Sequence, residues 1–182
     1  MQNILITGNV LPLDRLGLID QPMFERFQEK LKAGSWCHIF PEGRIWQNWR
    51  FNAAEESILG PFKCGVGKLI AHSYPNCPVV LPMYHTGMDK IVPEKVLTEK
   101  KKSRPSTPQS IIPKTGQNVS VFVGKPLDFT EKIKTFLMNN PDELESWRTS
   151  WKTIPLYYEI TEEIRKEVLL LEATAYNRSL SY

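Results

Sequence analysis

A helix followed by a short apolar strand occurs twice in the first half of this chain, and this order of elements limits the folds open to it. Asp20 is a suitable N-cap for a helix over Gln21–Lys32, which has apolar residues at helical spacing and Gly34 as a stop signal. The elements expected after it are a strand at 36–40, a short helix at 65–72 and a proline-bracketed strand at 78–83.

A third strand is predicted at 119–123, where β-branched residues end in the turn sequence Gly124-Lys125-Pro126. From about Pro141 the chain becomes helical, and an apolar stripe runs along it: Tyr157, Ile160, Ile164, Val168 and Leu171. This order predicts an α/β fold in which helices cover a mixed or parallel sheet, with a helical C-terminal region.

The length of 182 residues fits one domain, and we expect an α/β core over 1–130 followed by C-terminal helices over 131–182. A net charge of +3 is too small to indicate nucleic-acid binding. Cys37, Cys64 and Cys77 lack the spacing of a zinc site or a disulfide framework, so no metal site is predicted. No apolar run is long enough to span a bilayer.

The candidate site is the turn Pro41-Glu42-Gly43-Arg44, which follows the apolar run 36–40 directly. A strand that ends in proline, a carboxylate and glycine places charged groups and backbone N–H groups at the rim of a sheet. A guanidinium can bind phosphate through two hydrogen bonds, and Glu42 can accept a hydrogen bond from a hydroxyl group or hold a cation. The alternative is an ordinary turn with a surface carboxylate.

The next segment interleaves aromatic side chains with cations: Trp46, Trp49, Arg50 and Phe51. Aromatic residues favour the headgroup zone of a bilayer and cations pair with anionic lipids, so this segment is predicted to contact a membrane surface. Nucleic acid could use the same residue types, and the tryptophans could instead pack beneath the loop.

Several segments in this order resemble the glycerolipid acyltransferase superfamily, and within it the tafazzin-like transacylases. The matching segments are Leu11-Pro12-Leu13-Asp14-Arg15, His38-Ile39-Phe40-Pro41-Glu42-Gly43-Arg44, Gly65-Val66-Gly67-Lys68-Leu69-Ile70-Ala71, Leu81-Pro82-Met83-Tyr84-His85-Thr86-Gly87-Met88 and Gly124-Lys125-Pro126. The resemblance covers about Leu11 to Pro126.

The resemblance implies an acyltransferase that moves acyl chains between phospholipids and lysophospholipids, as in cardiolipin remodelling, with no bound cofactor. It implies a peripheral position on mitochondrial membranes with anionic lipid. It also implies that Arg15, Glu42, Gly43 and Arg44 hold the phosphate and glycerol of the acceptor.

The family's catalytic pair, a histidine and an aspartate in the spacing His-x4-Asp, is absent from this sequence. The fifth residue after each histidine is Gly43, Cys77 or Lys90, so we assign no catalytic residue. We expect the pair to lie before the Arg15 segment, in an N-terminal part that this sequence lacks.

Two other readings stay open. One is an acyl-CoA-dependent lysophosphatidate or glycerol-3-phosphate acyltransferase, which the replacement of Thr-Arg by Arg44-Ile45 after Gly43 disfavours. The other is a non-catalytic isoform that binds membranes or partners. His38 and His72 are expected to be buried, hydrogen-bonded histidines. His85 with Asp89 is a weak substitute for the missing pair.

Overall fold

The computed structural model describes residues 10–11, 19–43, 59–93 and 112–179, and the side chains of 177–179 are excluded. These residues belong to two compact units. The first unit is Met1–Pro41, Lys63–Val80 and Leu127–Glu162, and the second is Glu42–Phe62, Leu81–Pro126 and Glu163–Tyr182. The expected single domain over 1–182 stays a prediction.

The first unit begins with helix α2 (Pro22–Lys32), close to the predicted bounds. Gly34 ends it with a φ of 74°, as a left-handed stop requires. The N-cap prediction is wrong: Gln21 occupies that position without a side-chain bond, because the carboxylate of Asp20 contacts Lys68 instead.

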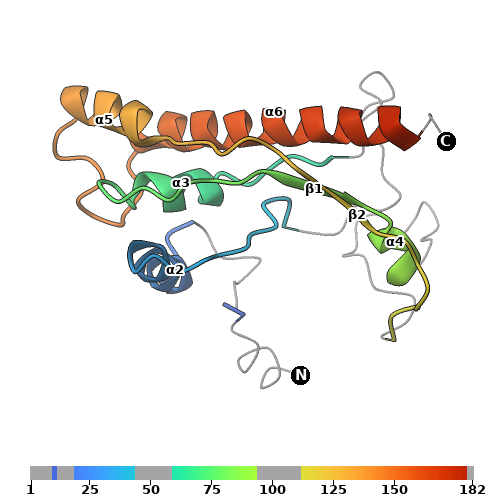
Figure 1. Ribbon diagram of the computed structural model, residues 1–182. Coiled ribbons are helices and arrows are strands. Elements are labelled where there is room, and N and C mark those ends of the chain that lie inside the picture. The colour runs from blue at the N-terminus through green and yellow to red at the C-terminus, as the bar shows by residue number, and fades with distance from the viewer. Residues whose placement is uncertain (1–9, 12–18, 44–58, 94–111, 180–182) are drawn as a thin grey trace, which may run out of the picture. The chain divides into compact units, whose positions relative to one another are not determined.

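The core of the first unit forms where α3 (Gly65–Ala71) meets the beginning of α6 (Thr153–Ser179) (Figure 1). An added Cβ at Gly67 would lie 2.1 Å from the carbonyl oxygen of Tyr157, so the two backbones touch at this glycine. Helix α5 (Thr130–Asn139) also contributes to the core. The buried apolar side chains here are Leu69, Ile70, Ala71, Phe129, Ile133, Leu156, Tyr157 and Ile160.

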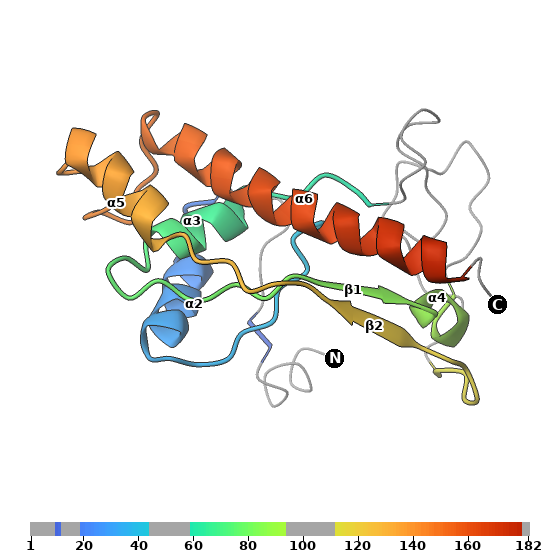
Figure 2. The same ribbon diagram turned by 45° about the horizontal axis from the view of Figure 1, so that its top comes forward.

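The second unit contains β1 (Met83–Thr86) and β2 (Ser120–Val123), which run antiparallel and side by side (Figure 2). Met83 pairs with Val123 and Thr86 with Ser120. After β1 the chain turns at Gly87, whose φ is 90°, into the short helix α4 (Met88–Ile91).

The described residues thus combine helices with a small sheet, in agreement with the α/β class, although that sheet is antiparallel rather than mixed or parallel. The strand predicted at 36–40 is wrong: its burial alternates, as in an extended chain, but no strand is assigned there. The strand predicted at 78–83 begins only at Met83. Pro78 and Pro82 lack the N–H that a ladder needs, and Val80 makes only an isolated bridge with Leu127.

Helix α6 confirms the predicted apolar stripe: Tyr157, Ile160, Ile164 and Val168 are buried, and Leu171 is half-buried. The helix begins at Thr153 rather than near Pro141, and residues 140–152 connect it to α5 without forming a helix. No helix in the described part of the chain has both the length and the apolar composition needed to cross a bilayer.

Candidate functional site

Glu42 and Gly43 form the turn that the sequence singled out. Gly43 has a φ of 68°, in the left-handed region that glycine adopts most easily, so the glycine is required by the backbone there. The Glu42 carboxylate accepts a hydrogen bond of 2.8 Å from the backbone N–H of Gly60. This contact links two positions 18 residues apart in the second unit.

Helix α6 brings a cation to the same place. The Nε of Arg165 donates to the carbonyl oxygen of Gly60 over 3.3 Å, so Gly60 contacts Glu42 through its N–H and Arg165 through its carbonyl. Both backbone groups of this buried glycine are therefore satisfied by charged side chains.

The carboxyl group of Glu42 is shifted toward its neutral form. Burial raises its pKa above the ordinary value, and the negative charge of Glu172 raises it further. The Gly60 N–H bond and the Arg165 charge act in the opposite direction. Burial is the largest of these causes, so the pKa of Glu42 stays above that of an ordinary glutamate.

Tyr84 of β1 and Tyr176 of α6 also belong to the second unit. Tyr84 is buried, and burial raises the pKa of its hydroxyl far above the ordinary value, with added contributions from Tyr176, Glu172 and Glu42. Tyr84 and Tyr176 are also hydrogen-bonded to each other. The second unit therefore contains two carboxylates, a guanidinium and two phenols, groups that can exchange hydrogen bonds with a hydroxyl group.

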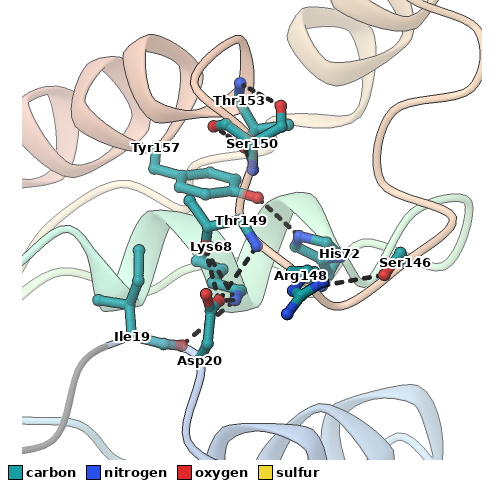
Figure 3. Close-up of polar contacts among 10 residues, drawn as sticks. All are labelled: Ile19, Asp20, Lys68, His72, Ser146, Arg148, Thr149, Ser150, Thr153 and Tyr157. Atoms are coloured by element: carbon teal, nitrogen blue, oxygen red, sulfur yellow. Dashed lines mark hydrogen bonds and ion pairs between the residues drawn. The ribbon is translucent and has the colours of Figure 1, made fainter.

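A separate polar cluster lies in the first unit and centres on Lys68 of α3 (Figure 3). The Lys68 side chain is fully buried and forms an ion pair with Asp20. Its ammonium also donates to Thr149 Oγ1 over 3.1 Å and to the Ile19 carbonyl oxygen over 3.3 Å. The ammonium lies 4.2 Å from the centre of the Trp147 ring. These contacts account for a buried cation, so Lys68 is structural.

His72 lies one turn after Lys68 and is a buried core histidine, as predicted. Its Nε2 is 2.7 Å from the Tyr157 hydroxyl (Figure 3), and its ring lies 4.8 Å from that of Trp147. Burial lowers the pKa of His72 to about 4, and the Lys68 charge contributes, so the ring is neutral at pH 7. A ring bonded in this way is not placed to receive a substrate proton.

The other two histidines lie elsewhere. His38, expected to be buried, is exposed. Its ring lies 4.6 Å from that of Phe40. His85 of β1 is exposed, as is Asp89 of α4. Within the described residues, no group of three or more histidine, cysteine or acidic side chains could hold a metal ion.

Of the predicted site residues, Glu42 and Gly43 are described. The others lie outside the described residues: Arg15, Arg44, Trp46, Trp49, Arg50 and Phe51. The structure adds Gly60, Arg165, Glu172 and Tyr84 around Glu42. The signal for Glu172 was present in the sequence: it lies four residues after Val168, on the apolar stripe of α6, where a carboxylate is unusual.

Similar proteins include N-acylphosphatidylethanolamine synthase of Arabidopsis thaliana, which is 33% identical over 123 residues, or 68% of this chain and 38% of the relative. Tafazzin of Drosophila melanogaster is 31% identical over 69% of this chain and 28% of its own length. Taffazin of Dictyostelium discoideum is 31% identical over 62% of this chain and 33% of its own length.

No protein-family model matches the chain, and no solved structure matches it significantly. The chain spans between 28% and 38% of the length of these three relatives. The names of these relatives agree with the family that the segments between Leu11 and Pro126 resemble. The chain is therefore similar to tafazzins and to an N-acylphosphatidylethanolamine synthase over about two thirds of its own length, and the resemblance that its motifs predicted is confirmed.

Proposed function

We propose that this chain forms the acceptor-binding part of a phospholipid acyltransferase with a glycerolipid-acyltransferase-like fold. The observation that carries the proposal is the Glu42 turn, where a half-buried carboxylate is held by the Gly60 N–H beside Arg165, in a chain similar to tafazzins. A carboxylate oxygen of Glu42 would accept a hydrogen bond from the free hydroxyl of a lysophospholipid, and cations near the turn would bind its phosphate.

The reaction proposed is transfer of an acyl chain from a phospholipid to a lysophospholipid. The acceptor hydroxyl oxygen forms a new ester bond to the acyl carbonyl, and the ester bond of the donor breaks. The acceptor's proton ends on the oxygen released from the donor, so no coenzyme is consumed. None of the three histidines is assigned as the base for this transfer. Glu42 instead orients the acceptor hydroxyl, whose oxygen attacks the acyl carbonyl.

We further propose a peripheral position on a mitochondrial membrane rich in anionic lipid, with cardiolipin remodelling as the physiological reaction. The support is the likeness to tafazzins together with the aromatic and basic sequence that follows Glu42. Membrane contact through Trp46, Trp49, Arg50 and Phe51 stays a prediction, as does phosphate binding by Arg15 and Arg44.

A second candidate is acyl transfer to an amine. The Arabidopsis relative is named a synthase of N-acylphosphatidylethanolamine, and it is 33% identical to this chain. In this case the acceptor atom would be the headgroup nitrogen of phosphatidylethanolamine. The two candidates differ in the atom that receives the acyl group and therefore in the product.

The test supplies phosphatidylcholine with a labelled acyl chain, together with monolysocardiolipin or phosphatidylethanolamine and no CoA. Labelled cardiolipin supports the first proposal, and labelled N-acylphosphatidylethanolamine supports the second. A requirement for acyl-CoA would favour the CoA-dependent reading. Liposome binding without turnover would favour a non-catalytic chain.

The role of Glu42 is tested by Glu42→Ala, with the exposed Glu163→Ala as the matched control. Loss of a hydrogen bond to a charged group should weaken monolysocardiolipin binding about tenfold or more. Far-UV circular dichroism and thermal unfolding should show that both variants keep the fold. An unchanged affinity for the lysolipid in Glu42→Ala would refute the proposed site.

A further inference from the structure

Gly60 connects the Glu42 turn to helix α6. Its N–H donates to the Glu42 carboxylate over 2.8 Å, and its carbonyl oxygen accepts from Arg165 Nε over 3.3 Å. A change in the position of Arg165 would therefore alter the hydrogen bond to Glu42 through a single buried glycine. The helix that carries Arg165 lies beyond Pro126, where the resemblance to acyltransferases ends.

Glu172 is the second charged residue of α6 near this turn. It follows Arg165 by seven residues, which is about two helical turns, so both lie on nearly the same face of α6. Glu172 is only 3% exposed, although its neighbours on the stripe are apolar. A buried carboxylate is unusual at a stripe position of a helix, which makes Glu172 a candidate for a role beyond packing.

We propose that α6 is part of the acceptor site, with Arg165 and Glu172 as positioning residues for the carboxylate of Glu42. The inference rests on the proposed function, since it assigns to that same site two residues outside the known motifs. Arg165 holds the Gly60 peptide that binds Glu42 and favours the ionised carboxylate. Glu172 favours the neutral form, so the two residues act in opposite directions on the pH range in which Glu42 can accept a hydrogen bond from a hydroxyl group.

The charges around the turn support this division of roles. Burial raises the pKa of Glu42 most, and the Gly60 hydrogen bond lowers it; Glu172 then raises the pKa and Arg165 lowers it. Tyr84 of β1 is influenced by the same carboxylates, and burial raises its pKa well above the ordinary value, so it remains a neutral hydroxyl at any pH used here. The charged side chains that influence Glu42 among the described residues therefore both come from α6.

The test uses Arg165→Gln and Glu172→Gln, with the exposed Lys166→Gln and Glu163→Gln as charge-matched controls on the same helix. Carboxyl titrations are followed by NMR in protein labelled with ¹³C at the glutamate side-chain carboxyl, and the Glu42 signal is identified by its loss in Glu42→Gln. The pKa of Glu42 should rise in Arg165→Gln, fall in Glu172→Gln and stay unchanged in both controls.

Binding of vesicles that contain monolysocardiolipin gives a second readout. Because the ionised carboxylate accepts the hydroxyl, the pH at half-maximal binding should move up in Arg165→Gln and down in Glu172→Gln. Arg165→Lys retains the charge but not the planar donor group, so it should restore the midpoint while recovering only part of the affinity. This variant also serves if Arg165→Gln does not fold.

An unchanged Glu42 titration in both Arg165→Gln and Glu172→Gln would overturn the inference, and so would shifts in the same direction. Failure of the proposed function has a different signature: Glu42→Ala would then bind the lysolipid as well as the wild type does. The NMR titration judges the role of α6 whichever result that binding experiment gives.

Discussion

Acid should destabilise this protein through His72, and the size of the effect follows from its surroundings. The ring is 4% exposed, and its pKa falls from 6.5 to about 4 on folding, chiefly through burial. The unfolded chain therefore binds a proton near pH 6.5, whereas the folded chain resists protonation until about pH 4. The contribution of His72 to stability is complete above pH 6.5 and is lost as the pH falls toward 4.

Because the pKa of His72 falls from 6.5 to about 4 on folding, the free energy of unfolding should be lower than at pH 7 by about 2 kcal/mol at pH 5 and about 3 kcal/mol at pH 4. His72→Gln can still bond the Tyr157 hydroxyl but does not titrate, so the loss should disappear in that variant. The exposed His38→Gln is the control, and it should retain the full acid loss.

The assay is urea unfolding followed by far-UV circular dichroism at pH 7, 6, 5 and 4. The quantity compared is the change in unfolding free energy with pH in each variant, because other acidic groups titrate equally in both and cancel in the difference. If the wild type and His72→Gln lose the same free energy between pH 7 and pH 5, burial does not hold the ring neutral and the reasoning is refuted.

Two further predictions concern the packing of α3. Asp20→Ala should lower the free energy of unfolding, measured with urea, by about 3 kcal/mol, because it leaves the buried Lys68 cation without its anion. Lys68→Met leaves only a half-exposed carboxylate and should lower it less. Equal losses in the two variants would contradict this. Gly67→Ala should abolish folding or cost more than about 4 kcal/mol, because its Cβ would lie 2.1 Å from the backbone of Tyr157. Gly65→Ala meets only a phenylalanine side chain at 2.9 Å and is the milder comparison, so thermal melts that show no difference between the two would contradict the packing described.

Patterns of neighbouring residues in the sequence correctly predicted those helices and strands that depend on residues close together in the chain. The spacing of apolar residues predicted α2 and the stripe of α6, and β-branched residues predicted β2. The burial of His72 also followed from its place in an apolar helix. In each case the residues that decide the outcome lie within a few positions of one another.

Contacts between distant residues could not be predicted in this way. Asp20 has the character of an N-cap, yet Lys68, 48 residues further on, binds its carboxylate. The run 36–40 has the composition of a strand, but the described residues give it no partner strand.

The same reason limited the prediction of the site. The turn at Glu42 and Gly43 was visible because proline, acid and glycine are adjacent in the sequence. Gly60 and Arg165 join it through hydrogen bonds across 18 and 105 positions, and Glu172 influences it through its charge. Only the carboxylate of Glu172 on an apolar stripe gave a local sign of them.

The central claim is that Glu42 recognises the free hydroxyl of a lysophospholipid. Cardiolipin and monolysocardiolipin carry the same two phosphates, but monolysocardiolipin has lost one acyl chain and so has one more free hydroxyl, on an outer glycerol. The most direct measurement is therefore the ratio of affinities for vesicles containing one or the other lipid, in the wild type and in Glu42→Ala. We predict that the wild type favours monolysocardiolipin about tenfold and that Glu42→Ala loses this preference while still binding both vesicles. The same preference in both proteins would contradict the claim.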